Sequence, residues 1–219
     1  MGEKSLKARI YFSPLGKLIH YATKLRSALG THCIVYGYRC KKTGKFLKRT
    51  RVASTAIITE PENLTIGDNV WINHYSRIDA SGGVTIGEGC QIGFGSMILS
   101  HSSHVAIRLL GLNYMDSDAN DRPGYVHRHT TIGEYTFVGG GSCILPGVTV
   151  GKGCVIGVNS VVTKDVPDYA VVVGSPARII GSTKNQDAPF LNDEQIKESY
   201  YDKESMQTSD NKGITPPHI

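Results

Sequence analysis

The fold is decided by a repeat that runs without a break through residues 130–162, which read TTIGEYTFVGGGSCILPGVTVGKGCVIGVNSVV. An aliphatic side chain returns at every sixth position of this stretch. These positions are Ile132, Val138, Ile144, Val150, Ile156 and Val162. The same spacing occurs upstream, at Ile66, Ile72 and Ile78 and again at Ile86, Ile92 and Ile98. A period of six fits neither an α-helix nor an ordinary alternating strand.

Short strands laid around a three-sided solenoid explain this period. One aliphatic side chain per face points inward, and Gly or another small residue takes each corner where the backbone bends. The phased positions then amount to roughly four coils of three strands each. The longer step between Ile78 and Ile86 contains Ser81, Gly82 and Gly83, which suit a bulge or turn. We therefore predict a mainly β chain with a parallel solenoid over residues 56–181.

The period vanishes between Leu99 and Thr131 and resumes in phase on the far side. We predict a long loop at residues 99–131 that leaves a continuous solenoid and returns to it. The loop carries four histidines, which are His101, His104, His127 and His129. A loop of this length inside a compact domain is either functional or disordered.

The charge is divided unevenly along the chain. Residues 1–51 hold 13 Lys and Arg and one acid, Glu3, whereas the remaining 168 residues hold 11 basic and 18 acidic side chains. Apolar residues from Tyr11 to Leu29 have roughly helical spacing, so we expect residues 1–55 to be a basic, partly helical segment. Its apolar face either packs on the main domain or lies on an anionic membrane surface. Residues 182–219 are expected to form a polar tail.

Composition excludes several other classes. No apolar run approaches the ~20 residues of a membrane span, and the first residues do not read as a secretory signal. The five Cys include no CxxC pair, so neither a disulfide framework nor a zinc site is expected. The basic segment carries no nucleic-acid-binding motif, and no nucleic-acid partner is expected. We expect a cytoplasmic protein with reduced thiols, with contact to the inner face of the membrane as an open possibility.

Residues 130–181 resemble the C-terminal half of the hexapeptide-repeat acetyltransferases. The resemblance rests on ILPGVTVGKGCVIGVNSVVTKDVPDYAVVVGSPARII, and residues 64–101 match more loosely. The groups it resembles are the maltose and galactoside O-acetyltransferases and the O-acetyltransferases of capsule and O-antigen. The resemblance implies a left-handed β-helix, a homotrimer, and acetyl-CoA as co-substrate in a groove between neighbouring solenoids.

The resemblance also implies a catalytic base, a His in the loop after a coil. Counted from the repeat position Ile98, the family position falls next to His104, which needs one inserted residue. Aligned on the family pattern His-Pro-x-x-x-x-x-Arg, His101 takes the catalytic place and Arg108 follows seven residues later. The smaller gap favours His104, and both histidines are kept as candidates.

Positions that bind the acetyl donor are carried over from the same resemblance. Gly140 takes the place of a small residue along the pantetheine slot, and Val158 that of an Ala whose backbone amide contacts the slot. Thr163, Lys164 and Arg178 stand where relatives meet the pantetheine arm and the adenosine phosphates. Phosphates are recognised by cations such as Lys and Arg.

Two further features concern the reaction itself. Gly139 opens a run of three glycines whose backbone N–H groups are a plausible source of stabilisation for an oxyanion. Phe137 replaces a Trp of the sugar-acetylating relatives, and with Arg108 it is the candidate for binding the acceptor. The single Trp of the chain, Trp71, lies in an earlier coil.

These residues predict an acetyl-CoA-dependent O-acetyltransferase with an imidazole as general base. The saccharide acceptor is expected in a surface polysaccharide, its lipid-linked precursor or a nucleotide sugar. Two alternatives stay open. The long loop is also typical of xenobiotic acetyltransferases, and the histidines suggest a zinc-dependent, carbonic-anhydrase-like protein. The spacing of His101 and His104 does not match the latter, so no metal site is expected.

Overall fold

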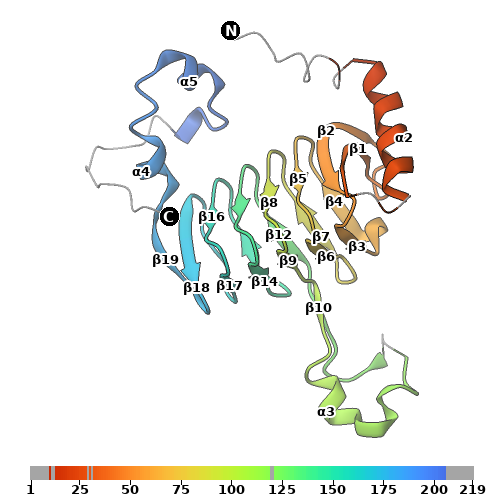
Figure 1. Cartoon of the computed structure of the whole chain (residues 1–219). Helices are drawn as coiled ribbons and strands as arrows, with labels where there is room; N and C mark the ends of the chain where they lie inside the picture. Colours follow the sequence, from red (N-terminus) through yellow and green to blue (C-terminus); the bar gives the residue numbers. More distant parts are fainter. Residues whose placement is uncertain (1–9, 11–12, 29, 31, 119–120, 206–219) are drawn as a thin grey trace.

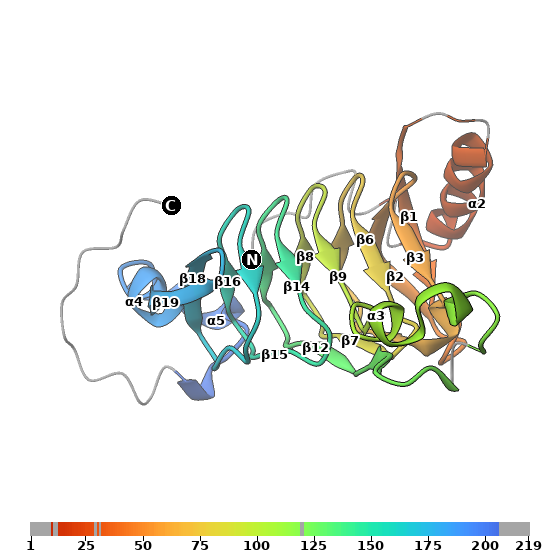
Figure 2. The ribbon, with the colours of Figure 1, turned by 90° about the horizontal axis from the view of Figure 1, so that it is seen from below.

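The computed structural model of the chain describes residue 10 and residues 13–28, 30, 32–118 and 121–205. These residues form a parallel β-solenoid with a helix at its N-terminal end and short helices at its C-terminal end (Figure 1). Seen from below, the coils follow one another along a single axis (Figure 2). The mainly β, three-sided solenoid predicted from the sequence is confirmed.

Three sheets form the sides of the solenoid, and each takes short strands from successive coils. Sheet A contains β2 (Phe46–Ala53), β5 (Trp71–Ile72), β8 (Gln91–Ile92), β13 (Phe137–Val138), β16 (Val155–Ile156) and β18 (Ala170–Gly174), with β1 (Ile34–Arg39) and β19 (Ala177–Ser182) at its two ends. Sheet B contains β3 (Ile57–Thr59), β6 (Arg77–Asp79), β9 (Met97–Ile98), β14 (Cys143–Ile144) and β17 (Val161–Val162). Sheet C contains β4 (Leu64–Ile66), β7 (Val84–Ile86), β12 (Thr130–Ile132) and β15 (Thr149–Val150).

The inward column of each sheet is aliphatic. In sheet C, Ile66 pairs with Ile86, Ile86 with Ile132, and Ile132 with Val150, all in parallel. All twelve period-six positions lie in the buried core, as their spacing predicts. Burial of these side chains is the main favourable term for folding, because no wider core exists in so narrow a prism.

The outward columns differ from face to face. Sheet C presents a column of threonines, which are Thr65, Thr85, Thr131 and Thr149. Sheet B presents a mostly apolar column, which is Ile57, Arg77, Met97, Cys143 and Val161. Sheet A presents a mixed column, which is Arg51, Trp71, Gln91, Phe137 and Val155. The three faces therefore offer different surfaces to solvent or to another chain.

The corner between sheets A and B repeats one local structure. Its buried serines are Ser76, Ser96, Ser142 and Ser160. The first three donate their hydroxyl hydrogens to carbonyl oxygens of the next coil over 2.8–2.9 Å. The residue before each Ser has a positive φ, and two of these residues are Gly95 and Gly141. A Cβ placed on Gly139, at the start of its turn, would lie 2.7 Å from the Ile156 carbonyl oxygen, so the approach of the next coil requires glycine.

The predicted loop at 99–131 is an ordered arm between β9 and β12. Its two ends pair as an antiparallel ladder of β10 (His101–Ser102) and β11 (Val126–His127), in which His101 is opposite His127. The tip holds α3 (Ala106–Leu110) and η2 (Gly111–Tyr114), and the arm projects from the solenoid (Figure 1). The sequence shows only a lost period here, because a two-residue ladder has no recognisable pattern of its own.

The N-terminal end of the solenoid is covered by a helix and a hairpin. Helix α2 (Leu15–Ala28) packs on the antiparallel pair of β1 and β2. The inward His20 is buried, and its Nδ1 lies 2.8 Å from the Tyr36 carbonyl oxygen. Strand β2 also pairs in parallel with β5 and is the first strand of sheet A from the solenoid itself. Strand β3 is followed by η1 (Pro61–Asn63), which leads into β4.

The C-terminal segment contacts the last coils through a hydrogen bond and an ion pair. It contains α4 (Thr183–Asp187) and α5 (Glu194–Ser199). Asp202 is buried beyond α5, where its carboxylate accepts a hydrogen bond from the Tyr169 hydroxyl and pairs with Lys152 Nζ at 2.7 Å. The hydrogen bonds from Lys152 and Tyr169 lower the pKa of Asp202. Among the helices of the described residues, none has the length and apolar composition to cross a membrane.

We expect Ile144→Ala to lower the free energy of unfolding by about 2–5 kcal/mol, because a cavity in so narrow a core cannot collapse easily. The outward, exposed Thr149→Ala is the matched control and should stay within about 0.5 kcal/mol. Urea unfolding followed by circular dichroism measures both changes. Equal losses in the two variants would contradict the assignment of inward and outward columns.

Candidate active site

His101 is held by the coil that precedes it. Ile78 pairs with Ile98, so one coil takes 20 residues here, and this spacing brings Ser81 beside His101. His101 Nδ1 contacts the Asp79 carboxylate and lies 2.9 Å from Ser81 Oγ. The Ser81 hydroxyl also donates to Asp79 Oδ1 over 2.7 Å. Asp79, Ser81 and His101 thus form one hydrogen-bonded group at the corner between sheets B and C.

Asp79 is a buried carboxylate that stays ionised. Its side chain is only 5% exposed, and the Ser100 hydroxyl donates to its backbone carbonyl oxygen over 2.6 Å. Burial opposes ionisation, but the hydrogen bonds from Ser81 and the contact with His101 outweigh it and lower the pKa of Asp79. An ionised Asp79 fixes one rotation of the imidazole ring of His101 and favours a proton on Nδ1.

The opposite ring nitrogen of His101 is therefore the proton acceptor. The His101 side chain is 37% exposed, so Nε2 can be reached from outside the solenoid. The ring of Tyr125 stacks on His101, with centroids 5.8 Å apart and 16° between the planes. His127 lies edge-on to Tyr125 at 5.0 Å. Two aromatic rings from the arm thus form a wall beside the imidazole.

His104 has a different setting. It is exposed between β10 and α3, and its Nδ1 lies 2.7 Å from Ser102 Oγ. Arg108, on α3, donates a hydrogen bond to the His104 carbonyl oxygen. The fourth histidine of the arm, His129, contacts Thr85 Oγ1 through Nε2 at 2.9 Å and lies on the outer side of sheet C. Of the two candidate bases, His101 is the one with a carboxylate partner.

The candidate donor-binding residues occupy two different corners. Gly139, Gly140 and Val158 lie at the corner between sheets A and B, where Val158 is 64% exposed. Arg178 in β19 pairs with Val173 and lies toward the same corner, at the end of the stack. Thr163 and Lys164 follow β17 and lie at the corner between sheets B and C, the corner that also carries His101. The width of sheet B separates the two groups within one chain.

Phe137, a candidate for acceptor binding, lies on the outer side of sheet A. It is 42% exposed and pairs with Gln91 on one side and Val155 on the other. Within one chain it therefore does not lie beside His101 or Arg108, which belong to the arm.

Sequence reasoning missed Asp79, Ser81 and Tyr125. A signal for the first two was present in the sequence. In a stacked solenoid, each candidate His lies beside a residue about one coil earlier in the chain, and the segment Asp-Ala-Ser-Gly-Gly stands at that distance. Tyr125 gave no signal, since its place next to His101 depends on the ladder of β10 and β11. In the described residues there is no group of three or more His, Cys, Asp or Glu side chains that could hold a metal ion.

Comparison with known proteins agrees with this architecture. Residues 129–164 match the family model of the bacterial transferase hexapeptide, six repeats. A Staphylococcus aureus protein named as a putative acetyltransferase is 43% identical over 86 residues, which cover 38% of this chain and 41% of that protein. A serine acetyltransferase of Bacillus pumilus is 35% identical over 116 residues, covering 53% of this chain and 44% of the relative. The chain thus spans less than half the length of these two relatives.

The fold of this chain is also similar to that of a solved structure. A galactoside acetyltransferase in complex with coenzyme A superposes with a TM-score of 0.51 at 29% identity, covering 61% of this chain and 62% of that one. The resemblance predicted from the sequence is confirmed: residues 129–164 match the bacterial transferase hexapeptide repeat, and the solenoid is similar in fold to this acetyltransferase.

The carboxyl group of Asp79 should titrate below the ordinary range of an aspartate. We expect His101→Ala and Ser81→Ala each to raise its pKa, because each removes a group that stabilises the charged form. Carbon-13 NMR of the Asp79 carboxyl carbon over a pH series measures this, with Ser103→Ala as the control. A pKa that is the same in all four proteins would show that the three side chains do not interact.

Proposed function

We propose that this chain is an acetyl-CoA-dependent O-acetyltransferase and that His101 is its general base. The observation that carries the proposal is the Asp79–His101 pair at a corner of a solenoid whose repeat is found in acetyltransferases. The sequence alone favoured His104, through the smaller alignment gap. The buried carboxylate partner of His101 is the reason for preferring His101 here.

The reaction requires little of the protein beyond a base and an oxyanion site. The donor supplies a thioester, whose carbonyl carbon an alcohol can attack. Nε2 of His101 takes the hydroxyl proton of the acceptor as its oxygen forms the new C–O bond. Asp79 stabilises the imidazolium that results, and this imidazolium returns the proton to the departing thiolate. Backbone N–H groups at a solenoid corner, such as those near Gly140, would stabilise the negative charge on the carbonyl oxygen.

The donor fits the corner between sheets A and B. Glycines at 139 and 140 place no side chain at their own turn, and the exposed Val158 offers an apolar contact beside them. The exposed guanidinium of Arg178 lies toward the end of this corner, where it could bind a phosphate. At the corner between sheets B and C, the exposed Lys164 is a second cation that could bind a phosphate. A galactoside acetyltransferase with coenzyme A bound has the same fold, which supports this assignment.

The separation of these residues supports a homotrimer. Around a three-fold axis the contacts are heterologous, so a different edge of each subunit meets its neighbour. The edge of sheet B that carries His101 in one subunit would then face the other edge of sheet B in the neighbouring subunit. That other edge carries Gly140 and Val158. The apolar outer column of sheet B, which includes Met97 and Val161, is the surface such an assembly would bury.

The acceptor is proposed to be a sugar hydroxyl of a surface polysaccharide, its lipid-linked precursor or a nucleotide sugar. Tyr125 beside His101 offers an aromatic surface of the kind on which a sugar ring can pack. Arg108 on the arm and Phe137 of another subunit are further candidates for binding it. A lipid-linked acceptor would bring the protein to the cytoplasmic face of the membrane. The arm equally allows a xenobiotic hydroxyl compound, and an acceptor panel separates the two.

We expect His101→Ala to reduce acceptor-dependent release of CoA thiol by about 10²- to 10⁴-fold in kcat/KM. Asp79→Asn should lose part of this activity, because the ring of His101 is no longer held by a charge. His104→Ala should stay within a few-fold of the parent. Thiol release from acetyl-CoA with saccharide and antibiotic acceptors measures all three. A large loss in His104→Ala with normal activity in His101→Ala would assign the base to His104.

We expect Val161→Glu to convert the trimer to monomers and to abolish activity with it, because a charge in a buried apolar face is costly. Thr149→Glu, on the outer side of sheet C, is the matched control and should remain trimeric and active. Analytical ultracentrifugation gives the mass of each protein. An active monomer would show that the site is complete within one chain.

A further inference from the structure

The N-terminal end of the solenoid presents a surface that the proposed reaction does not use. We call it the basic cap, and define it as helix α2 together with the hairpin of β1 and β2. From residue 4 to residue 59 the sequence holds 13 Lys and Arg and no Asp or Glu. Nine of these cations are described and exposed: Lys17, Lys24, Arg26, Arg39, Lys41, Lys42, Lys45, Lys48 and Arg49. Within the basic cap, the described charged side chains are therefore all basic.

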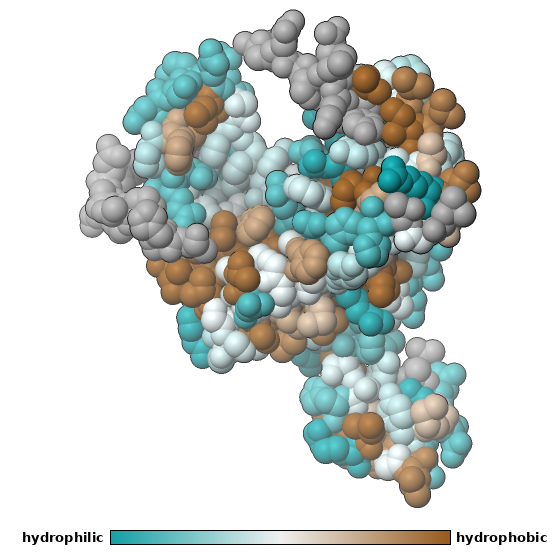
Figure 3. All heavy atoms as spheres, in the orientation of Figure 1, coloured by the Kyte–Doolittle hydropathy of each residue, from teal (hydrophilic) through white to brown (hydrophobic). Residues whose placement is uncertain are grey.

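Helix α2 has two unlike faces. Its inner face places His20 against the hairpin, where the ring lies edge-on to Phe46 at 5.2 Å. The opposite face carries an apolar stripe of Leu15, Leu18, Tyr21 and Leu25, which are 50%, 66%, 60% and 67% exposed. Figure 3 shows brown, apolar atoms gathered over α2. Positions three and four apart on a helix share one face, so the stripe is continuous.

Cations border this stripe on both sides. At 3.6 residues per turn, Lys17 and Lys24 fall on one flank of the stripe and Arg26 on the other. Among the described side chains, Lys17 and Lys24 form no ion pair with a carboxylate. An apolar stripe between basic flanks is typical of a helix that lies in the plane of a membrane interface.

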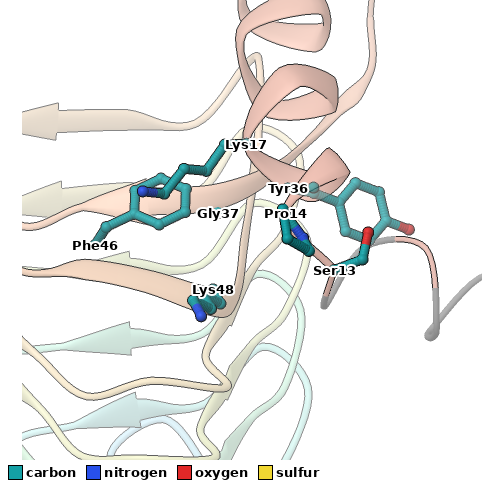
Figure 4. A pocket seen from close by; sticks show the side chains of 8 residues that line it. Ser13, Pro14, Lys17, Tyr36, Gly37, Phe46 and Lys48 are labelled. Atoms are coloured by element: carbon teal, nitrogen blue, oxygen red, sulfur yellow. The ribbon is translucent and has the colours of Figure 1, made fainter.

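Two hollows beside α2 are lined by the same cations. One, of about 240 Å³, lies between the start of α2 and the hairpin, with Lys17 and Lys48 among its lining residues. Figure 4 shows Lys17, Phe46 and Lys48 on one side of it and Ser13 and Tyr36 on the other. The second hollow, of about 360 Å³, has Lys24, Arg39 and Lys41 at an otherwise largely apolar site. Ammonium groups around a recess of this size can bind a phosphate oxyanion.

We propose that the basic cap is a docking surface for an anionic lipid bilayer. The apolar stripe of α2 inserts among the acyl chains near the headgroups, and the lysines of the two hollows bind lipid phosphates. Charge complementarity selects this occupant, since a cap whose described charged side chains are all basic repels a second cap of the same kind. The proposal does not depend on the acetyl transfer, because no residue of the Asp79–His101 group belongs to the cap.

Binding to vesicles tests this directly. We expect the whole protein to co-sediment with vesicles of phosphatidylcholine and phosphatidylglycerol and to bind pure phosphatidylcholine much more weakly. Binding should weaken as salt is raised, because exposed charges are screened beyond about 10 Å at 0.1 M. Equal binding to neutral and anionic vesicles, or no binding to either, would overturn the proposal.

Two variants separate the apolar and the electrostatic contributions. The double variant Lys17→Glu, Lys48→Glu should weaken binding by about 30-fold or more, since two favourable charges are reversed. The double variant Leu18→Glu, Leu25→Glu should lose binding to a similar extent. The control is Leu112→Glu at the tip of the arm, where the side chain is 97% exposed and lies outside the cap; it should bind as the parent does. Thermal melting confirms that each variant is folded.

The position of the stripe in the bilayer gives a third readout. In Tyr21→Trp, anionic vesicles should shift the added tryptophan emission to the blue, as expected for a ring that leaves water. The parent, with Trp71 alone, provides the baseline. If instead Leu18→Glu, Leu25→Glu lowers the mass of the protein in lipid-free solution and leaves vesicle binding unchanged, the stripe is a contact between copies of this chain and the proposal is wrong.

Discussion

Each coil of the solenoid must pair its backbone N–H and C=O groups with the coils above and below it in one register. Where the chain bends, side-chain hydroxyls add further hydrogen bonds to this ladder. The buried hydroxyls of Ser76, Ser96 and Ser142 donate to carbonyl oxygens at the corner between sheets A and B. Buried hydroxyls need such acceptors, and the close approach of the coils leaves room only for a small side chain here and for glycine at the start of the turn.

The need for one register between stacked coils also explains which features could be predicted from the sequence. The positions that point inward, such as Ile132 and Ile144, recur with a fixed period, and a period is visible in one sequence. The Asp79–Ser81–His101 group depends on which residues of neighbouring coils lie side by side, and that follows only once the coil length at this point is known to be 20 residues. Tyr125 reaches His101 through an arm whose two-residue ladder has no periodic signature. Periodic features were therefore predictable, and contacts made across the interruption were not.

The corners and the faces of the prism differ in the side chains that they present. The corner between sheets B and C carries the histidine, the corner between A and B is lined with glycine, and the outer side of sheet B between them is apolar. Sheet C, by contrast, presents threonines, which are compatible with solvent. The mostly apolar outer side of sheet B favours lateral contact through that face. His101, the proposed base, is at the edge of that face rather than inside the narrow core, where there is no room for a substrate.

The arm leaves and rejoins the stack at almost one point. Arg128 N donates to the Ser100 carbonyl oxygen, and Thr130 Oγ1 donates to that of Leu99, so the two ends are closed by hydrogen bonds. The free energy of closing a loop rises only slowly with its length. Insertions or exchanges within residues 103–124 would consequently leave the coil register and the contact of His101 with Asp79 in place. In the proposed enzyme, the base would stay anchored to the stack through Asp79, while changes at the tip of the arm alone could alter which acceptor binds.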